Sequence, residues 1–119
     1  MPDTQKNVYK KLLGRKGENL VAKHLKKQGC KILKRNFVTP FGEADLIVED
    51  GDETVFVEVK TRTSERFGTP AEAVGLEKQK RYYKIAQFYG LQIGEEPNAR
   101  FDVVQVFADG RIDHIKNAF

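Results

Sequence analysis

The sequence has few of the residues from which disulfides and zinc sites are built. Its 119 residues include one cysteine, Cys30, and two histidines, His24 and His114. A single cysteine excludes an internal disulfide, and these three residues do not make a zinc site. No apolar run approaches the ~20 residues of a membrane helix, and the opening MPDTQKNVYKK lacks the apolar stretch of a signal peptide. We therefore expect a cytoplasmic protein with no membrane partner.

Signals for several enzyme classes are missing as well. No glycine-rich phosphate loop follows a predicted strand, and no serine or cysteine stands beside a histidine at a spacing typical of nucleophilic catalysis. Repeats, low-complexity tracts and linkers are also lacking, and 39% hydrophobic with 32% charged residues is an ordinary globular composition. These features predict a single domain over residues 1–119, with residues 1–7 and 117–119 as flexible tails.

Charge is unevenly distributed along the chain. Residues 1–35 contain eleven lysines and arginines against two acids, whereas the remainder contains ten against fifteen. A basic N-terminal third could attract phosphate groups. It could equally be the solvated face of a helix.

Hydrophobic periodicity predicts two helices. Residues 8–28 repeat apolar side chains at helical spacing, and Gly29 stands where a helix-ending glycine belongs. Thr69-Pro70-Ala71-Glu72 has the form of a capping box with proline at the first helical position. The main second helix is expected to run to about Tyr89 and to end at Gly90.

The remaining segments predict strands and a mixed α/β or α+β sheet. Asp50-Gly51 is the expected turn between the second and third strands. The element order becomes α-β-β-β-α-β-β. The predicted strands cover residues 31–38, 43–49, 54–62, 100–108 and 111–116.

Residues 55–63, VFVEVKTRT, place charges inside an apolar strand, where they cost free energy unless they are paired. Alternation sets Glu58 and Lys60 on one face, and it sets Glu43 and Asp45 on one face of the preceding strand, opposite to Ala44, Leu46 and Val48. A two-residue turn would put Glu43 opposite Glu58, and a four-residue turn would put Asp45 there. Either register gathers these four charges. They could form a salt-bridge ladder, or the carboxylates could hold a divalent cation such as Mg²⁺.

Both predicted helices carry polar residues on or near their apolar sides. Glu18 leans toward an apolar stripe that includes Val21 and Ala22, and Lys78 falls on the inner stripe of the second helix. Three cations of that helix, Lys80, Arg81 and Lys84, lie mostly outward. Together with Tyr82, which falls on the inner stripe, and Tyr83, they interleave charge with aromatic rings, which suits nucleic acid. They could also be a solvated basic face over core tyrosines. Asp102 could support a site or pair with Arg100, and we favour the pairing.

An acid in the first helix, then GEAD at residues 42–45 and VEVK at residues 57–60, resembles the PD-(D/E)XK nuclease superfamily. Within it, the chain closely resembles the YraN-like family over roughly residues 14–106. The supporting stretches are GRKGENLVAKHLKKQG, RNFVTPFGEADLI, VFVEVKTRT, RFGTPAEAV, EKQKRYYKIA and RFDVV. The resemblance implies a restriction endonuclease-like core. One departure is Ala44, where a bulkier aliphatic residue is usual.

The resemblance also implies roles by position. Asp45 and Glu58 match the metal-binding carboxylates, and Lys60 matches the lysine of the signature. Glu18 matches the first-helix acid of Holliday-junction-resolvase-like members, and Gln79 resembles a second-helix glutamine of some relatives. Glu43 belongs to the family's GE-x-D motif.

Together these features predict a divalent-metal-dependent endonuclease that hydrolyses phosphodiester bonds in structured or branched DNA, such as junctions or flaps. Mg²⁺ or Mn²⁺ is the expected cofactor, held by Asp45, Glu58 and Glu18, with Lys60 as a catalytic residue. Glu43 and Asp102 are candidate supporting residues. The expected nucleic-acid contacts are Arg15, Lys16, Arg62, Arg66, Lys78, Gln79 and Arg81.

Two alternatives stay open from the sequence. The chain could bind nucleic acid without cutting it, or it could be a protein-interaction module whose charge cluster is purely structural. A homodimer would bring two sites to a two-stranded substrate.

Overall fold

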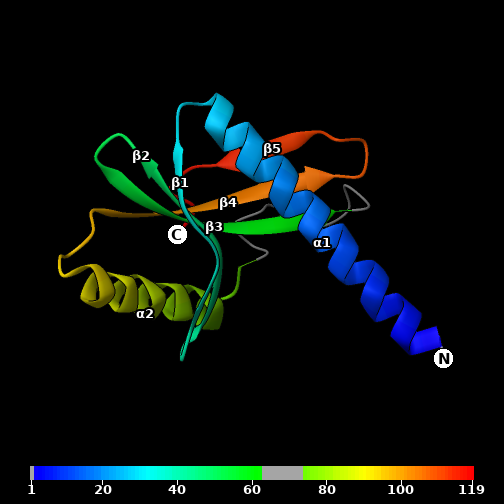
Figure 1. Cartoon of the computed structure of the whole chain (residues 1–119), viewed down its shortest axis with the longest axis horizontal. Coiled ribbons are helices and arrows are strands. Elements are labelled where there is room, and N and C mark those ends of the chain that lie inside the picture. Colours follow the sequence, from blue (N-terminus) through cyan, green and yellow to red (C-terminus); the bar gives the residue numbers. More distant parts are fainter. Residues whose placement is uncertain (1, 63–73) are drawn as a thin grey trace.

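A computed structural model describes residues 2–62 and 74–119, with side chains from residue 14 onward (Figure 1). In this part of the chain the predicted order α-β-β-β-α-β-β is confirmed. The elements are α1 (Pro2–Lys27), β1 (Lys31–Thr39), β2 (Gly42–Asp50), β3 (Glu53–Arg62), α2 (Leu76–Ile93), β4 (Ala99–Phe107) and β5 (Ile112–Ile115). Neither helix in these ranges is long and apolar enough to span a membrane.

The strands form one mixed sheet in the order β1-β2-β3-β4-β5. Neighbouring strands are antiparallel except for β3 and β4, which run parallel. A parallel pair needs a crossover, and α2 lies within this one. The two helices lie on opposite faces of the sheet, so the fold has three layers (Figure 1).

Alternation along β3 divides the core between the two faces. Val55 and Val57 join the cluster beneath α1, whereas Phe56 joins the cluster beneath α2. Each helix supplies the matching stripe. These stripes are Val21, Ala22 and Leu25 from α1, and Tyr82, Ile85, Ala86 and Tyr89 from α2.

The sequence predicted that α2 ends at Gly90, but the helix continues to Ile93. Gly94, with a left-handed φ of 78°, is the residue that ends it. Gly90 has another purpose, because a Cβ there would lie 2.8 Å from Pro97 Cδ and 3.0 Å from the carbonyl oxygen of Glu95. The glycine lets the loop after α2 fold back against the helix. The predicted capping box at residues 69–72 lies outside the described residues.

The close approach of Pro97 and Glu95 to Gly90 predicts that Gly90→Ala destabilises the fold, although alanine is the better helix former. The clash is expected to cost about 1–3 kcal/mol. Gly14→Ala, at a position in α1 where an added Cβ meets nothing within 4 Å, is expected instead to gain up to about 1 kcal/mol. Urea unfolding of both variants measures the difference, and a stabilised Gly90→Ala protein would contradict the packing role.

The C-terminus is packed rather than loose. Residues 117–119 were expected to be a flexible tail, but the Phe119 ring stacks on Phe101 with centroids 5.4 Å apart. The Ala118 N–H donates to the Phe101 carbonyl oxygen at 2.7 Å. The reason is that Phe119 completes an aromatic cluster at the edge of the α2 face. At the other end, α1 begins at Pro2 rather than at residue 8.

Candidate active site

The site forms where β2 and β3 separate. Asp50 pairs with Glu53, so the turn residues are Gly51 and Asp52, one position later than predicted. The same register would set Asp45 opposite Glu58, but regular pairing stops at Leu46 and Val57. Beyond that level, the Val59 N–H donates to Asp45 Oδ2 at 2.7 Å. The aspartate side chain therefore takes the place of a backbone partner between the two strands.

This separation also interrupts the alternation of β2. Leu46 and Val48 both face α1, but Ala44 joins Ile47 beneath α2, so the prediction that Ala44 shares a face with Leu46 and Val48 was wrong. Opposite this point, Asn36 of β1 has a left-handed φ of 49°. Both strands leave regular geometry around Asp45, and strict alternation no longer holds there.

Asp45 carries the most perturbed carboxyl group of the site. Burial, followed by the charge of Glu58, raises the pKa of Asp45 to about 7, although the bond from Val59 opposes the rise. Desolvation and a neighbouring carboxylate both disfavour the charged form. The two acids are thus close enough to repel each other, which is an arrangement that a cation relieves.

Glu58 is 5% exposed and is held from several directions. The Tyr82 hydroxyl donates to its Oε2 at 2.5 Å. Lys78 of α2 donates to its Oε1, and Lys60 Nζ lies 3.3 Å from the same oxygen. Burial lowers the pKa of Lys60, although Glu58 beside it opposes that effect. Two ammonium groups and a phenol therefore fix one carboxylate.

The acids of α1 and the start of β2 form a second group beside this one. With the Asn36 amide oriented so that its nitrogen faces the acids, it donates to Glu43 Oε1 and to Glu18 Oε2, both at 3.1 Å. Burial is the largest cause of a raised pKa for Glu18, and the charge of Glu43 adds to it. Glu18 also contributes to the raised pKa of Asp45.

These positions limit the metal set. Among the side chains that the structure describes, no three acids, histidines or cysteines are arranged to hold one ion. In the structure Glu18 is held by Asn36 beside Glu43, and its place in the metal set stays a prediction. The pair of Asp45 and Glu58 still suits Mg²⁺, which takes one or two carboxylates together with water and substrate phosphates.

The residues predicted to contact nucleic acid divide into two groups. Arg15, Lys16 and Arg81 are exposed on the two helices. Three others contact the protein itself: Arg62 Nε donates to Gln105 Oε1 at 3.0 Å, Lys78 donates to Glu58, and Gln79 Nε2 donates to the Val74 carbonyl oxygen at 3.0 Å. Arg66 lies outside the described residues.

Asp102 lies away from this cluster, on the face of the sheet that carries α1. Arg100 donates to both of its carboxylate oxygens, through Nε at 3.0 Å and Nη2 at 2.9 Å. His114 Nε2 lies 2.7 Å from Oδ2, and the Asn117 N–H donates to Oδ1 at 2.9 Å. Asp102 thus pairs with Arg100 and belongs to a structural network rather than to the paired acids.

Sequence reasoning missed two residues that organise the site. Tyr82 was interpreted as a core or stacking residue, yet its hydroxyl orients Glu58. The sequence did carry a signal for this role, because Tyr82 follows Lys78 by four positions and so lies on the same stripe of α2. Asn36 had no comparable signal, since its contacts with Glu18 and Glu43 depend on the approach of α1 to the sheet.

Comparison with known proteins supplies a family. A model of the uncharacterised protein family UPF0102 matches residues 17–106. A UPF0102 protein of Thermodesulfovibrio yellowstonii is 45% identical over 107 residues, which cover 90% of this chain and 95% of the relative. One from Syntrophus aciditrophicus is 49% identical over 111 residues, covering 89% and 87%. Among solved structures, Pyrococcus furiosus SfsA in complex with Ca²⁺ matches with a TM-score of 0.36 and 16% identity, over 90% of this chain and 63% of that one.

Proposed function

This chain belongs to the uncharacterised protein family UPF0102, and we propose that it is a divalent-metal-dependent endonuclease acting on phosphodiester bonds in structured or branched DNA. The supporting observation is the pair of Asp45 and Glu58, which meet where β2 and β3 separate. The charge of Glu58 contributes to the raised pKa of Asp45. Lys60 lies beside the pair, 3.3 Å from Glu58. A buried acid whose pKa is raised partly by a second acid, with a lysine beside them, is typical of a catalytic centre.

Asp45 and Glu58 are the residues that would hold Mg²⁺ or Mn²⁺. When bound, such an ion supplies polarisation of a phosphoryl oxygen and a lower pKa for its water. The Val59 N–H and the Tyr82 hydroxyl keep the two carboxylates in place. Lys60 is placed to orient the attacking water or to stabilise negative charge at the phosphorus centre.

The exposed cations of the helices are suited to the DNA backbone. Arg15 and Lys16 extend from α1, and Arg81 extends from α2. Contacts of this kind depend on charge and position rather than on base identity. We therefore expect recognition of DNA shape, such as a junction or a flap, rather than of sequence.

A cleavage assay on junction, flap and single-stranded DNA, with RNA in parallel, tests the proposal. We expect cleavage in Mg²⁺ or Mn²⁺ and none in excess EDTA. Lys60→Ala is expected to lower the rate by about 100-fold or more. Lys31→Ala, an exposed lysine on β1, serves as the control. Cleavage that persists in excess EDTA would remove the metal mechanism.

One observation favours a second function. Both oxygens of Glu58 already have partners in Lys78, Lys60 and Tyr82, as expected of a protein that binds nucleic acid without cutting it. That alternative predicts salt-sensitive DNA binding that is unchanged by Lys60→Ala, with no metal-dependent turnover.

The ion pair between Lys78 and Glu58 predicts an unusual gain in metal affinity. Lys78→Met removes a positive charge that competes with a divalent ion for Glu58, so Mn²⁺ should bind about tenfold more tightly. Calorimetric titration measures this, with Lys84→Met on the exposed side of α2 as the control. Equal affinity of the wild type and Lys78→Met would contradict the competition, and an absence of binding in both would contradict the metal site.

A further inference from the structure

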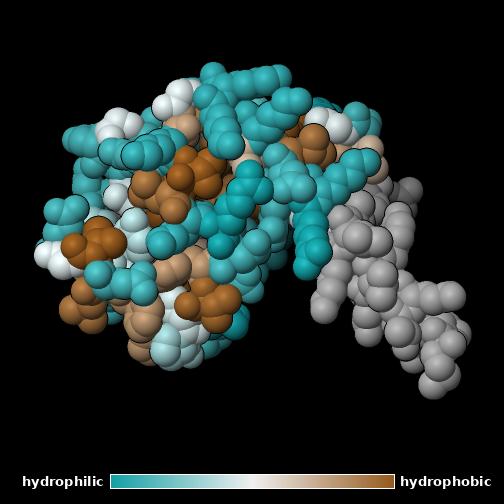
Figure 2. Space-filling model, viewed as in Figure 1, coloured by the Kyte–Doolittle hydropathy of each residue, from teal (hydrophilic) through white to brown (hydrophobic). Residues whose placement is uncertain are grey.

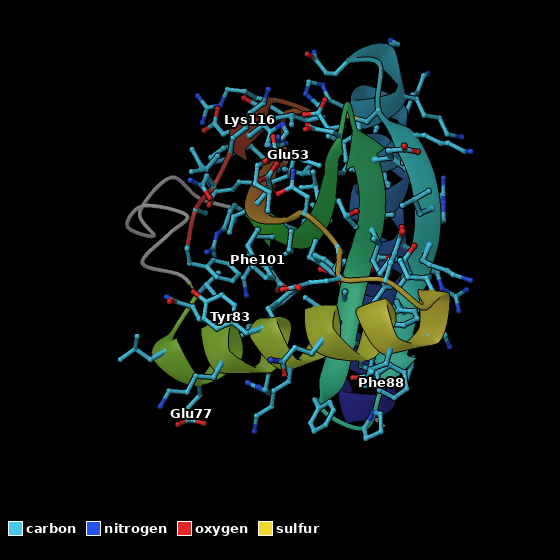
Figure 3. The ribbon with its side chains drawn as sticks, turned by 90° about the vertical axis from the view of Figure 1, so that its left-hand side faces the viewer. Glu53, Glu77, Tyr83, Phe88, Phe101 and Lys116 are labelled. Carbon is cyan, nitrogen blue, oxygen red and sulfur yellow. The ribbon has the colours of Figure 1, made fainter. Side chains whose placement is uncertain are left out.

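A groove of about 800 Å³ runs along one flank of α2. Its walls include Tyr83 and Leu91 of the helix, Pro97 of the following loop and Phe101 of β4. Figure 3 shows Tyr83 and Phe101 next to each other beside α2, and their centroids are 5.0 Å apart. Leu91 is 84% exposed, and Figure 2 shows hydrophobic side chains at the surface where α2 ends and the loop to β4 begins.

The exposed residues of this flank follow a helical stripe. Leu76, Tyr83 and Leu91 are separated by seven and eight positions, which places them on one side of α2. Lys80 lies on the stripe between the first two. Glu95 and Glu96 follow its C-terminal end and border the groove. The flank is therefore apolar along its length, cationic near one end and acidic at the other.

We propose that this flank is a homodimer interface, in which α2 packs antiparallel against α2 of a second copy around a two-fold axis at Gln87. Residues equally far before and after Gln87 then lie opposite each other. Tyr83 and Leu91, each four positions away, form apolar pairs. Lys80, seven positions before Gln87, meets the segment of the partner that begins at Gly94 and carries Glu95 and Glu96. The flank is thus complementary to itself in both polarity and charge.

Nucleic acid is a poorer occupant of the groove. Glu95 and Glu96 at its border repel phosphates, which nucleic-acid surfaces attract through cations. The proposed active site also stays open in the dimer, because Lys78 contacts Glu58 on the sheet side of α2. The inference therefore does not depend on the proposed nuclease activity.

The size of the surface sets the expected affinity. An α2 of 18 residues is about 27 Å long. One flank of such a helix with a neighbouring loop gives an interface at the small end of specific complexes. We therefore expect a reversible dimer with a dissociation constant of about 1–100 μM.

Sedimentation equilibrium of the full chain from about 1 μM to about 500 μM, a range that brackets a small interface, tests the dimer. Leu91→Glu is expected to weaken it at least about tenfold, because a charge would enter the apolar pairs. Val38→Glu, at a position on β1 that is 71% exposed, should leave it unchanged. Circular dichroism checks that both variants fold.

A charge exchange gives an independent readout. Lys80→Glu should weaken the dimer about fivefold, and adding Glu95→Lys should restore it. A wild type that stays monomeric at the highest concentration, or a dimer unaffected by Leu91→Glu, would overturn the proposal. A monomeric wild type that binds single-stranded oligonucleotides, and binds them more weakly after Leu91→Glu, would overturn it as well. The groove would then bind a nucleobase.

Discussion

Asp45→Asn is expected to abolish metal-dependent cleavage and, at the same time, to stabilise the folded protein at pH 8. Asparagine keeps an oxygen for the Val59 N–H, which donates to Asp45 at 2.7 Å, but it removes one of the two carboxylates proposed to hold the metal. Stabilisation by a bound ion is worth several kcal/mol in the transition state, so the rate should fall by about 1000-fold or more. Binding of Mn²⁺, measured by calorimetry, should fall with it.

The gain in stability follows from the raised pKa. Burial and Glu58 hold the pKa of Asp45 at about 7 in the folded state, far above its ordinary value of 3.8. The Asp45 carboxyl group therefore makes its full contribution to the free energy of unfolding below about pH 4. This contribution is lost as the pH rises through about 7. The change corresponds to at most about 4 kcal/mol, and screening together with the nearby lysines should reduce it to about 1–3 kcal/mol. Asparagine cannot ionise, so it avoids the loss.

Urea unfolding in EDTA at about pH 4.5, 6 and 8, which spans this titration, tests the stability effect. The difference between Asp45→Asn and the wild type should grow with pH and level off above about 8. Asp52→Asn, in the exposed hairpin turn between β2 and β3, should show no such trend. A variant less stable than the wild type at every pH would mean that the carboxylate repulsion is already neutralised by the lysines.

Asp102→Ala is expected to be the most destabilising single change. The side chain of Asp102 is fully buried and accepts from Arg100, His114 and the Asn117 N–H. Its removal leaves Arg100, which is 9% exposed, with Asp50 and Glu53 as its remaining charged partners among the described residues. Breaking a buried charge pair from one side costs about 3–5 kcal/mol. Thermal and urea unfolding measure the loss.

The contribution of Asp102 to stability depends on pH with the opposite sign from the contribution of Asp45. Burial opposes ionisation of Asp102, but hydrogen bonds from His114 and Arg100 outweigh it, and the pKa is lowered. The stabilisation is therefore present above about pH 4 and is lost as the pH falls through the lower folded-state pKa. The gap between the wild type and Asp102→Ala should narrow in acid. Asp113→Ala, on β5 of the same sheet, is the control, and an equally unstable control would assign the effect to the strand rather than to Asp102.

The order of the elements could be predicted from local sequence patterns alone. Strand alternation and helical spacing are local, so the strands and the inner position of Lys78 on α2 could be predicted from neighbouring residues. The charges in VFVEVKTRT also indicated that Glu58 needs partners, because an unpaired charge inside a strand is costly whatever the fold.

The partners of these charges, in contrast, depend on how distant segments of the chain pack together. The separation of β2 from β3 at Asp45 changed the face of Ala44 and replaced a ladder hydrogen bond with a carboxylate. The approach of α1 placed Asn36 between Glu18 and Glu43, and the loop after α2 gave Gly90 a packing role. These outcomes depend on segments far apart in the chain, whose distance and orientation are set by packing rather than by local periodicity.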